Sequence, residues 1–252
     1  MERRVTFGIL FNMEKIISIV GLTASGKSAL GIKIAQELNG EIISADSRQV
    51  YRGLDIGTAK ITKEEQALVP HHLLDVVNAG DHFTVYEFQR LAYTIIDDIL
   101  SRKKLPIIVG GTGLYSRSVV EGYTFKKGGK AGSKYAVCQI CLMPSKEFIS
   151  PLVEARIESR LKDGMIDETR NLLEQGVPRD WLQSLGLEYY WNIEYIEGRI
   201  SLDEYKRNLA TKTMQFAKRQ RTWFKREKNT RFLTDPKTFY EDTIKLIKRF
   251  LT

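Results

Sequence analysis

Cysteine and histidine, which supply disulfides and most transition-metal ligands, are scarce in this chain. Its 252 residues include two cysteines and three histidines. Two cysteines cannot form the disulfide framework of a small secreted domain, so we expect a reducing compartment, the cytoplasm. No second Cys or Cys/His pair accompanies Cys138 and Cys141, and this argues against a four-ligand zinc site. We expect both to be core thiols.

Long apolar runs are also lacking. No run approaches the roughly 20 residues that a membrane-spanning helix needs, so we expect no membrane segment. A short apolar stretch, Val5–Phe11, follows the basic residues Arg3 and Arg4. It continues into Asn12–Lys15 without the small residues of a signal-peptide cleavage site. We therefore interpret residues 1–12 as an N-terminal extension rather than a signal peptide.

Excess negative charge is absent, and the positive charge is concentrated in one region. The formal net charge is +8, from 39 Lys and Arg against 31 Asp and Glu. The segment 199–231 alone holds 11 Lys and Arg and three Asp and Glu. Such a basic stripe suits a polyanionic partner, although a solvated helix face has a similar composition.

The first part of the chain has the pattern of a parallel α/β sheet. A short β-branched run, 15–20, predicts a buried strand, and apolar residues at helical spacing predict a helix over 29–38. A second strand is expected over 41–45, ending at Asp46. This strand–loop–helix–strand order begins a doubly wound sheet, whose ligands bind beyond the carboxyl ends of the strands.

The remaining pattern alternates between helix and strand up to residue 142 and is helical from Ser145 onward. It predicts a helix over 84–100 capped by Thr84 and Glu87, a strand over 105–109, a Lys- and Gly-rich loop over 123–134 and a strand over 135–142. We therefore predict an α/β fold with a P-loop NTPase-like parallel sheet flanked by helices and a mostly helical C-terminal half. A single core is expected over 13–252, with sheet and helices in 13–122, the loop in 123–134, and the last strand and helices in 135–252.

Between the first strand and helix lies the sequence Gly-Leu-Thr-Ala-Ser-Gly-Lys-Ser, residues 21–28. The spacing Gly-x4-Gly-Lys-Ser is that of a P-loop, whose backbone N–H groups and following helix bind a diphosphate. Lys27 would add a positive charge, and the Ser28 hydroxyl would reach a bound Mg²⁺. The strand–loop–helix context makes a chance match far less plausible than phosphate binding.

Most P-loop NTPases place a metal-binding acid at the end of another buried strand. Here the strand ending at Val109 is followed by Gly110 and Gly111. The acid follows the strand after the P-loop helix instead, at Asp46. This position suits a general base that faces an acceptor across the phosphates, although an Asp-Ser turn cap is the structural alternative.

Six motifs in this order resemble the tRNA dimethylallyltransferase family and cover most of the chain. They are residues 21–28, Asp46-Ser-Arg-Gln-Val-Tyr51, Gly53-Leu-Asp-Ile-Gly-Thr-Ala-Lys60, His71-His-Leu-Leu-Asp75, Gly110-Gly-Thr-Gly-Leu-Tyr115 and Ala217-Lys-Arg-Gln-Arg-Thr-Trp-Phe224. The resemblance implies transfer of a dimethylallyl group from dimethylallyl diphosphate to the N6 amine of an adenosine beside the tRNA anticodon. It also implies Mg²⁺ as cofactor and the tRNA anticodon loop as partner, and we expect a monomer.

The resemblance assigns roles to residues of the matching motifs. It implies catalytic roles for Asp46, Thr23 and Arg156, with Ser28 at the metal. The expected diphosphate-binding residues are Gly21, Thr23, Ala24, Ser25, Gly26, Lys27 and Ser28. The expected adenine- and tRNA-binding residues are Asp46, Ser47, Arg48, Gln49, Thr112, Gly113, Lys218, Arg219 and Arg221. Arg160 shares a helical face with Arg156, and we expect it to be a surface arginine.

The chain departs from the family pattern at the helical insertion that grips the anticodon stem. Only residues 123–134 stand in its place, and four lysines there offer alternative phosphate contacts: Lys126, Lys127, Lys130 and Lys134. The deletion leaves open a related enzyme that prenylates free AMP, ADP or ATP, as in cytokinin synthesis. A P-loop kinase of small metabolites and a non-catalytic nucleic-acid-binding module are weaker alternatives.

Overall fold

A parallel six-stranded sheet forms the centre of the computed structural model, which describes residues 13–125, 129–130 and 132–252. The predicted extension, 1–12, lies outside these residues. The strand order is β10-β9-β1-β6-β2-β4, and each neighbouring pair is parallel. The strands are β1 (Lys15–Gly21), β2 (Gly40–Ser44), β4 (His71–His72), β6 (Leu105–Gly110), β9 (Ala136–Leu142) and β10 (Thr230–Leu233). The predicted α/β fold is confirmed.

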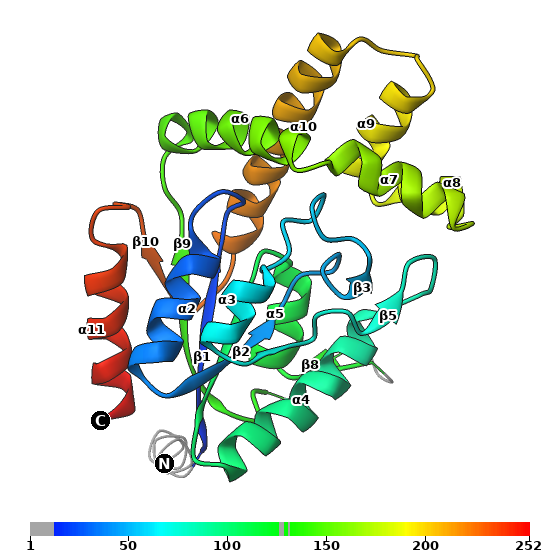
Figure 1. Ribbon diagram of the computed structural model, residues 1–252. Helices are drawn as coiled ribbons and strands as arrows, with labels where there is room; N and C mark the ends of the chain where they lie inside the picture. The colour runs from blue at the N-terminus through cyan, green and yellow to red at the C-terminus, as the bar shows by residue number, and fades with distance from the viewer. Residues whose placement is uncertain (1–12, 126–128, 131) are drawn as a thin grey trace.

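Helices cover both faces of this sheet (Figure 1). Successive side chains of a strand point to opposite faces. Ile17 and Ile19 therefore join one apolar core, and Ile16 joins the other. Burial on both faces explains why β1 is continuously apolar rather than alternating. The covering helices are α2 (Lys27–Glu37) and α11 (Phe239–Leu251) on one face, and α4 (Val85–Ser101) and α5 (Gly113–Val120) on the other.

Side-chain caps determine where several helices begin. The Thr84 hydroxyl accepts a hydrogen bond from the Glu87 N–H, and the Glu87 carboxylate accepts one from the Thr84 N–H, as predicted. Ser201 and Glu204 form the same box at the start of α10 (Leu202–Phe224). A third box, formed by Thr62 and Glu65, begins α3 (Lys63–Leu68).

The C-terminal half is largely helical, and the helices between β9 and β10 lie beyond the carboxyl ends of the strands (Figure 1). Tyr205, Leu209 and Phe224 of α10 are buried in one cluster with Val20 and Leu22, at the end of β1. The long helix α10 thus joins these helices to the P-loop of residues 21–28, the phosphate loop. The other helices are α6 (Lys146–Lys162), α7 (Met165–Glu174), α8 (Arg179–Ser184) and α9 (Leu187–Ile196).

The segment predicted as a loop over 123–134 contains a short antiparallel pair, β7 (Tyr123–Thr124) with β8 (Gly129–Lys130). Two-residue strands give no periodic pattern, so the sequence does not reveal them. Of the four lysines expected to contact phosphates, Lys126 and Lys127 and the side chain of Lys130 lie outside the described residues. Lys134 instead forms an ion pair with Asp97 at 2.6 Å. A further short parallel pair joins β3 (Tyr51–Arg52) to β5 (Val77–Asn78).

Cys138 and Cys141 lie in β9 as free thiols, Cys141 buried and Cys138 half-buried. Burial raises the pKa of the Cys138 thiol to about 11 and that of Cys141 to about 12. In the described part of the chain, no three His, Cys, Asp or Glu side chains gather closely enough to hold a metal ion. No helix among the described residues is long and apolar enough to cross a bilayer.

Candidate active site

A cavity of about 520 Å³ opens at the carboxyl ends of the central strands. This site cavity lies between the phosphate loop, the turn after β2, and the residues after β6. The segment 57–61 and helices α6 and α10 complete it. Of the predicted residues it is lined by Thr23, Ala24, Ser25, Gly26, Lys27, Ser28, Asp46, Ser47, Arg48, Gln49, Thr112 and Arg156.

Two glycines shape the phosphate loop. Gly21 has φ +153°, and a Cβ there would lie 2.5 Å from the Leu142 carbonyl oxygen. Its expected part in diphosphate binding is therefore to let the loop turn against β9, since it does not itself line the cavity. Gly26 has φ +82° and caps the N-terminus of α2. The first turn of α2, with Lys27 and Ser28, consequently points its N–H groups toward the cavity.

Two cations face this cavity without a carboxylate partner. Burial, and then the charge of Arg156, lower the pKa of Lys27 to about 8. Burial, and then the charge of Arg160, lower the pKa of Arg156 to about 10. Neither Lys27 nor Arg156 forms an ion pair with any described residue. A bound anion would stabilise enclosed like charges of this kind, so the pair marks a candidate anion site.

Two buried hydroxyls on the cavity wall also lack partners. Ser25 Oγ and Thr213 Oγ1 form no hydrogen bond in the part of the chain that the structure describes, and their residues are 4% and 8% exposed. Buried polar atoms are normally satisfied. Both residues line the cavity, where a bound ligand would supply the missing partner. Thr213, on α10, is a candidate binding residue that the sequence analysis missed.

Asp46 begins a tight turn at the end of β2. Its Oδ1 accepts hydrogen bonds from the backbone N–H groups of Arg48 at 2.9 Å and Gln49 at 3.4 Å. Oδ2 has no hydrogen-bond partner among the described residues. The two interpretations of Asp46 are thus compatible, because one oxygen caps the turn while the carboxylate lines the cavity. The turn fixes the direction in which the second oxygen can act.

Thr112 holds the next residue of this turn. Its Oγ1 accepts a hydrogen bond from the Ser47 N–H at 3.0 Å and donates one to Ser47 Oγ at 3.2 Å. Gly113 is not among the residues that line the cavity. A Cβ at Gly113 would lie 2.3 Å from Trp223 Nε1, so the glycine allows α5 and α10 to approach each other. Its expected role in adenine binding has no support from this placement.

Arg48 and Gln49 line the cavity, but their polar ends bind other parts of the chain. The Arg48 guanidinium donates to the Leu185 carbonyl and pairs with Glu188 at 3.4 Å. The Gln49 amide donates to the carbonyls of Ala59 at 3.1 Å and Thr58 at 3.4 Å. These side chains hold the cavity wall in place, which differs from the direct adenine contact expected of them.

Arg160 is buried, and the expectation of a surface arginine is wrong. The residue is 9% exposed, and its guanidinium pairs with Glu188 at 2.8 Å and donates to the Gly57 carbonyl at 3.1 Å. Glu188 therefore forms ion pairs with both Arg160 and Arg48 and none with Arg156. Glu188 was missed because its two partners are distant in the sequence.

Gln220 is a third residue that the sequence analysis left without a role. Its Oε1 accepts a hydrogen bond from the Thr23 N–H at 2.8 Å, and its Nε2 donates to the Gly111 carbonyl at 3.0 Å. The side chain thus joins the phosphate loop to the segment after β6. A signal was present, because Gln220 shares helical spacing with the buried residues Thr213, Ala217 and Phe224.

The predicted tRNA-binding cations lie on α10 beyond the cavity. Lys218 and Arg219 are exposed, and the Arg219 guanidinium lies 5.7 Å from the centre of the Phe216 ring. Arg221 is half-buried and donates to the Pro144 carbonyl. Lys218 and Arg219 also line a shallow groove beside the half-exposed ring of Trp223. Two of the three cations are thus available to a partner.

A parallel sheet, a phosphate loop and an uncompensated pair of cations define a P-loop enzyme with a phosphorylated substrate. The family model described as IPP transferase matches residues 49–134 and 123–227, and the one described as isopentenyl transferase matches 14–80. The chain is 36% identical to the tRNA dimethylallyltransferase of Streptococcus sanguinis, with 94% of this chain and 98% of the relative aligned. It is 34% identical to that of Caldicellulosiruptor saccharolyticus, with 84% and 90% aligned. The chain belongs to the IPP transferase family.

A solved structure supports the same conclusion. The tRNA isopentenylpyrophosphate transferase of Bacillus halodurans superposes with a TM-score of 0.86 at 31% identity, covering 94% of this chain and 97% of that one. The alignments to the two relatives run over 291 and 282 positions, more than the 252 residues of this chain. Those relatives therefore carry segments that are missing here. The two matches to the IPP transferase model overlap over residues 123–134. This agrees with a shortened insertion at that position.

Proposed function

We propose that this protein transfers the dimethylallyl group of dimethylallyl diphosphate to the N6 amine of an adenosine beside the anticodon of tRNA. The observation that carries the proposal is the cavity in which Lys27 and Arg156 lack carboxylate partners while Asp46 has an unpartnered carboxylate oxygen. Cations for a leaving diphosphate and a base for an attacking amine are what this reaction requires. The identity of the two substrates is inferred from the family relationship.

The reaction is a substitution at the allylic carbon. The adenine N6 forms a bond to C1 of the dimethylallyl group, and the bond from C1 to the diphosphate oxygen breaks, its electron pair leaving with the diphosphate. Lys27, Arg156 and the amides of the phosphate loop stabilise the charge that develops on the leaving group. The N6 proton passes to the Asp46 carboxylate, and the Thr23 hydroxyl donates to the oxygen of the breaking bond.

The donor set fits a Mg²⁺ ion that enters with the diphosphate. Ser28, in the first turn of α2, is half-buried and lines the cavity, and no group of three acidic or histidine side chains is present among the described residues. The ion would be held by the Ser28 hydroxyl and mostly by substrate oxygens and water, as is common for Mg²⁺. When bound, it neutralises part of the diphosphate charge.

The acceptor adenosine has to leave its base stack to reach Asp46. Ser47, next to Asp46 in the chain, and Thr112, which binds Ser47, both line the cavity and offer hydroxyl groups to the base. We assign Lys218 and Arg219 to phosphate contacts of the anticodon loop because they are exposed on the helix that also supplies Gln220. Arg221 is assigned to hold α10 against Pro144. We place the reaction in the cytoplasm with a monomeric enzyme, in keeping with the tRNA substrate and the free thiols.

Labelled acceptor assays test the proposal. The protein is incubated with labelled dimethylallyl diphosphate and, separately, with tRNA and with AMP, ADP and ATP. We expect label on tRNA at an adenosine beside the anticodon, with release of one diphosphate per label. Label on a free nucleotide but not on tRNA would contradict the acceptor assignment. Phosphate transfer from ATP without prenylation would contradict the whole reaction.

Prenylation of a free adenine nucleotide is the second candidate. It is favoured by the short β7–β8 pair at the position where the two family matches meet, since a free nucleotide needs no grip on an anticodon stem. The basic face of α10 favours tRNA. The same assay separates the two acceptors.

A further inference from the structure

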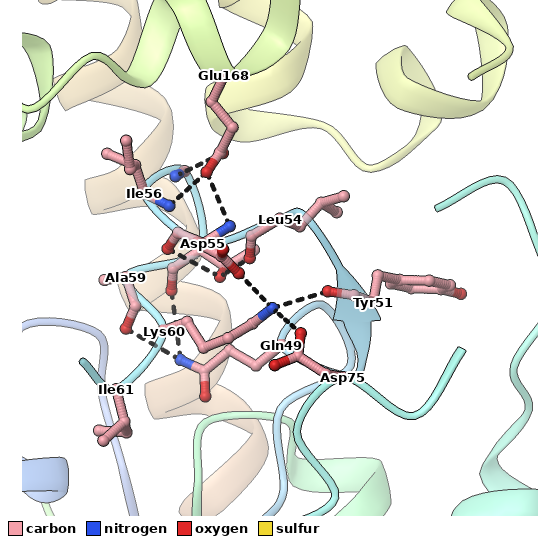
Figure 2. A network of polar contacts seen from close by, with 12 residues as sticks. Gln49, Tyr51, Leu54, Asp55, Ile56, Ala59, Lys60, Ile61, Asp75 and Glu168 are labelled. Carbon is pink, nitrogen blue, oxygen red and sulfur yellow. Dashed lines mark hydrogen bonds and ion pairs between the residues drawn. The ribbon is translucent and has the colours of Figure 1, made fainter. Parts of the chain in front are cut away.

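Glu168 of α7 reaches across to the segment that walls the site cavity, and its carboxylate receives an unusual set of donors. Oε2 accepts hydrogen bonds from the backbone N–H groups of Asp55 at 2.8 Å and Ile56 at 2.6 Å, and Oε1 accepts one from Gly57 at 3.0 Å. Figure 2 shows the carboxylate above these amides. The Tyr189 hydroxyl donates to Oε1 at 2.9 Å. Three consecutive amides and a hydroxyl bound to one carboxylate make a strong anchor.

The far end of the same segment is anchored by Lys60. Its side chain is 4% exposed, and its ammonium contacts Asp55 Oδ1 at 2.6 Å, Asp75 Oδ1 at 2.6 Å and the Tyr51 carbonyl at 2.8 Å. Figure 2 shows the ammonium between these three acceptors. Residues 55–60 are therefore held at both ends, although most of them form no regular secondary structure.

From this segment the hydrogen bonds continue to the predicted base. The carbonyls of Thr58 and Ala59 accept from the Gln49 side chain, and the Gln49 backbone N–H donates to Asp46 Oδ1. Residues 57–61 also line the cavity directly. A second branch runs from the Gly57 carbonyl to Arg160, which lies one helical turn from Arg156. The segment 55–60 thus connects α7 with both sides of the cavity.

We propose that Glu168 is a positioning residue for the transfer reaction, acting through segment 55–60 and Gln49 to hold the Asp46 carboxylate in its working direction. This inference rests on the proposed function. Glu168 does not touch the substrate, because it is not among the residues that line the cavity. Its effect belongs to the chemical step and not to the binding of tRNA, since α10 carries the exposed cations.

The test compares three variants in steady-state transfer assays. Glu168→Gln removes the charge and one of the two acceptors while keeping the size of the side chain, and we expect kcat to fall by about tenfold to a hundredfold, as small misplacements of reacting groups do. We expect the Kd for tRNA to stay within about twofold. Glu168→Asp keeps the charge but is one methylene shorter, so it should recover part of kcat. Asp167→Asn removes the neighbouring exposed charge on α7 and should match wild type.

Hydrogen exchange provides a readout independent of activity. In Glu168→Gln we expect faster exchange at the amides of residues 55–57 and also at those of Arg48 and Gln49, which bind Asp46 Oδ1. Faster exchange at 55–57 alone, with kcat unchanged, would overturn the proposal. Equal losses of kcat in Glu168→Gln and Asp167→Asn would overturn it as well, since the effect would then be one of general charge.

Failure of the proposed function is distinguishable from failure of this inference. Wild-type protein that transfers no label to tRNA would contradict the function. The exchange rates at Arg48 and Gln49 would still decide whether Glu168 holds Asp46. Unchanged rates there in Glu168→Gln, measured on a variant that unfolds at the wild-type temperature, would exclude the positioning role.

Discussion

At the scale of single residues, we propose two tasks for the two carboxylate oxygens of Asp46, capping the turn and accepting a proton. Replacing Asp46 by Asn keeps an oxygen that can cap the turn through the Arg48 and Gln49 amides but removes the proton acceptor. We expect Asp46→Asn to lower kcat by about a hundredfold to ten-thousandfold, the usual contribution of a general base. The Kd for inorganic diphosphate, measured by calorimetry, should stay near the wild-type value. A comparable loss of both would mean that Asp46 mainly supports the phosphate loop.

We expect Lys27 to make diphosphate binding depend on pH. Because the pKa of Lys27 is lowered to about 8, Lys27 is mostly charged below that pH and mostly neutral above it. A bound diphosphate favours the charged form, so the affinity for inorganic diphosphate should fall above pH 8, by up to about tenfold per pH unit. Lys27→Arg stays charged throughout this range and should not show this loss. If the affinity of wild type and of Lys27→Arg falls equally steeply with pH, the effect comes from titration of the diphosphate and not of Lys27.

Several residues at this scale were predictable and several were not. The spacing of the phosphate loop and the position of Asp46 after a strand depend on contiguous sequence, and the structure places Lys27, Asp46 and Arg156 around one cavity. The side-chain partners of Arg48 and Arg160 lie 28 to 140 residues away in the chain, and the two carbonyls bound by the Gln49 amide nitrogen lie 9 and 10 residues away. No local pattern encodes such pairs, which is why the burial of Arg160 was missed.

At the scale of elements, α10 presents a basic face to solvent while its opposite face completes the cavity. The double substitution Lys218→Gln and Arg219→Gln should weaken tRNA binding and reduce the slope of log K against log salt by about 0.7 to 0.9 for each lost phosphate contact. Lys245→Gln, on an exposed position of α11, serves as control and should leave the slope unchanged. A wild-type slope near zero would exclude the α10 face as the docking surface.

Regular elements were predicted better than the segments between them. The strands 15–20 and 105–109 agree with β1 and β6 because burial on both faces makes them short continuous apolar runs. The helix 84–100 agrees with α4 because its apolar residues recur at helical spacing after a capping box. The segment 55–60 carries no period, and its conformation depends on Glu168 and Lys60, which bind it from outside or across a turn. The sequence therefore indicates the motif that contains residues 55–60 but not the contacts that hold its conformation.

At the scale of the whole molecule, Glu41 at the start of β2 connects β4, the end of α4 and the start of β6. It is 2% exposed, and its carboxylate binds Arg102, Lys104 at 2.8 Å and His72 at 2.8 Å. Hydrogen bonds from Arg102, opposed by burial and aided by Lys104, hold the pKa of Glu41 well below its ordinary value of 4.5. The resulting stability is fully present above pH 4.5 and is lost as pH falls below it through the folded-state pKa.

We therefore expect Glu41→Gln to lower the free energy of unfolding by about 1–3 kcal/mol at neutral pH. The difference from wild type should shrink as the pH falls below 4.5, because the unfolded wild-type chain then takes up a proton at Glu41 that the folded state does not bind until its lower pKa is reached. Urea unfolding at a series of pH values measures this. A constant difference from pH 7 to pH 3 would show that the loss comes from packing and not from the charge.

The bridge formed by Gln220 has a consequence for how the protein is made. Thr23 and Gln220 are 197 residues apart, so the ribosome has synthesised most of the chain before the phosphate loop can meet the side chain that fixes it. A nascent chain that exposes β1, the phosphate loop and α2 lacks Arg156, Thr213 and Gln220 on its cavity wall. We therefore expect the ability to capture a diphosphate to arise late in translation, after α10 has emerged and docked.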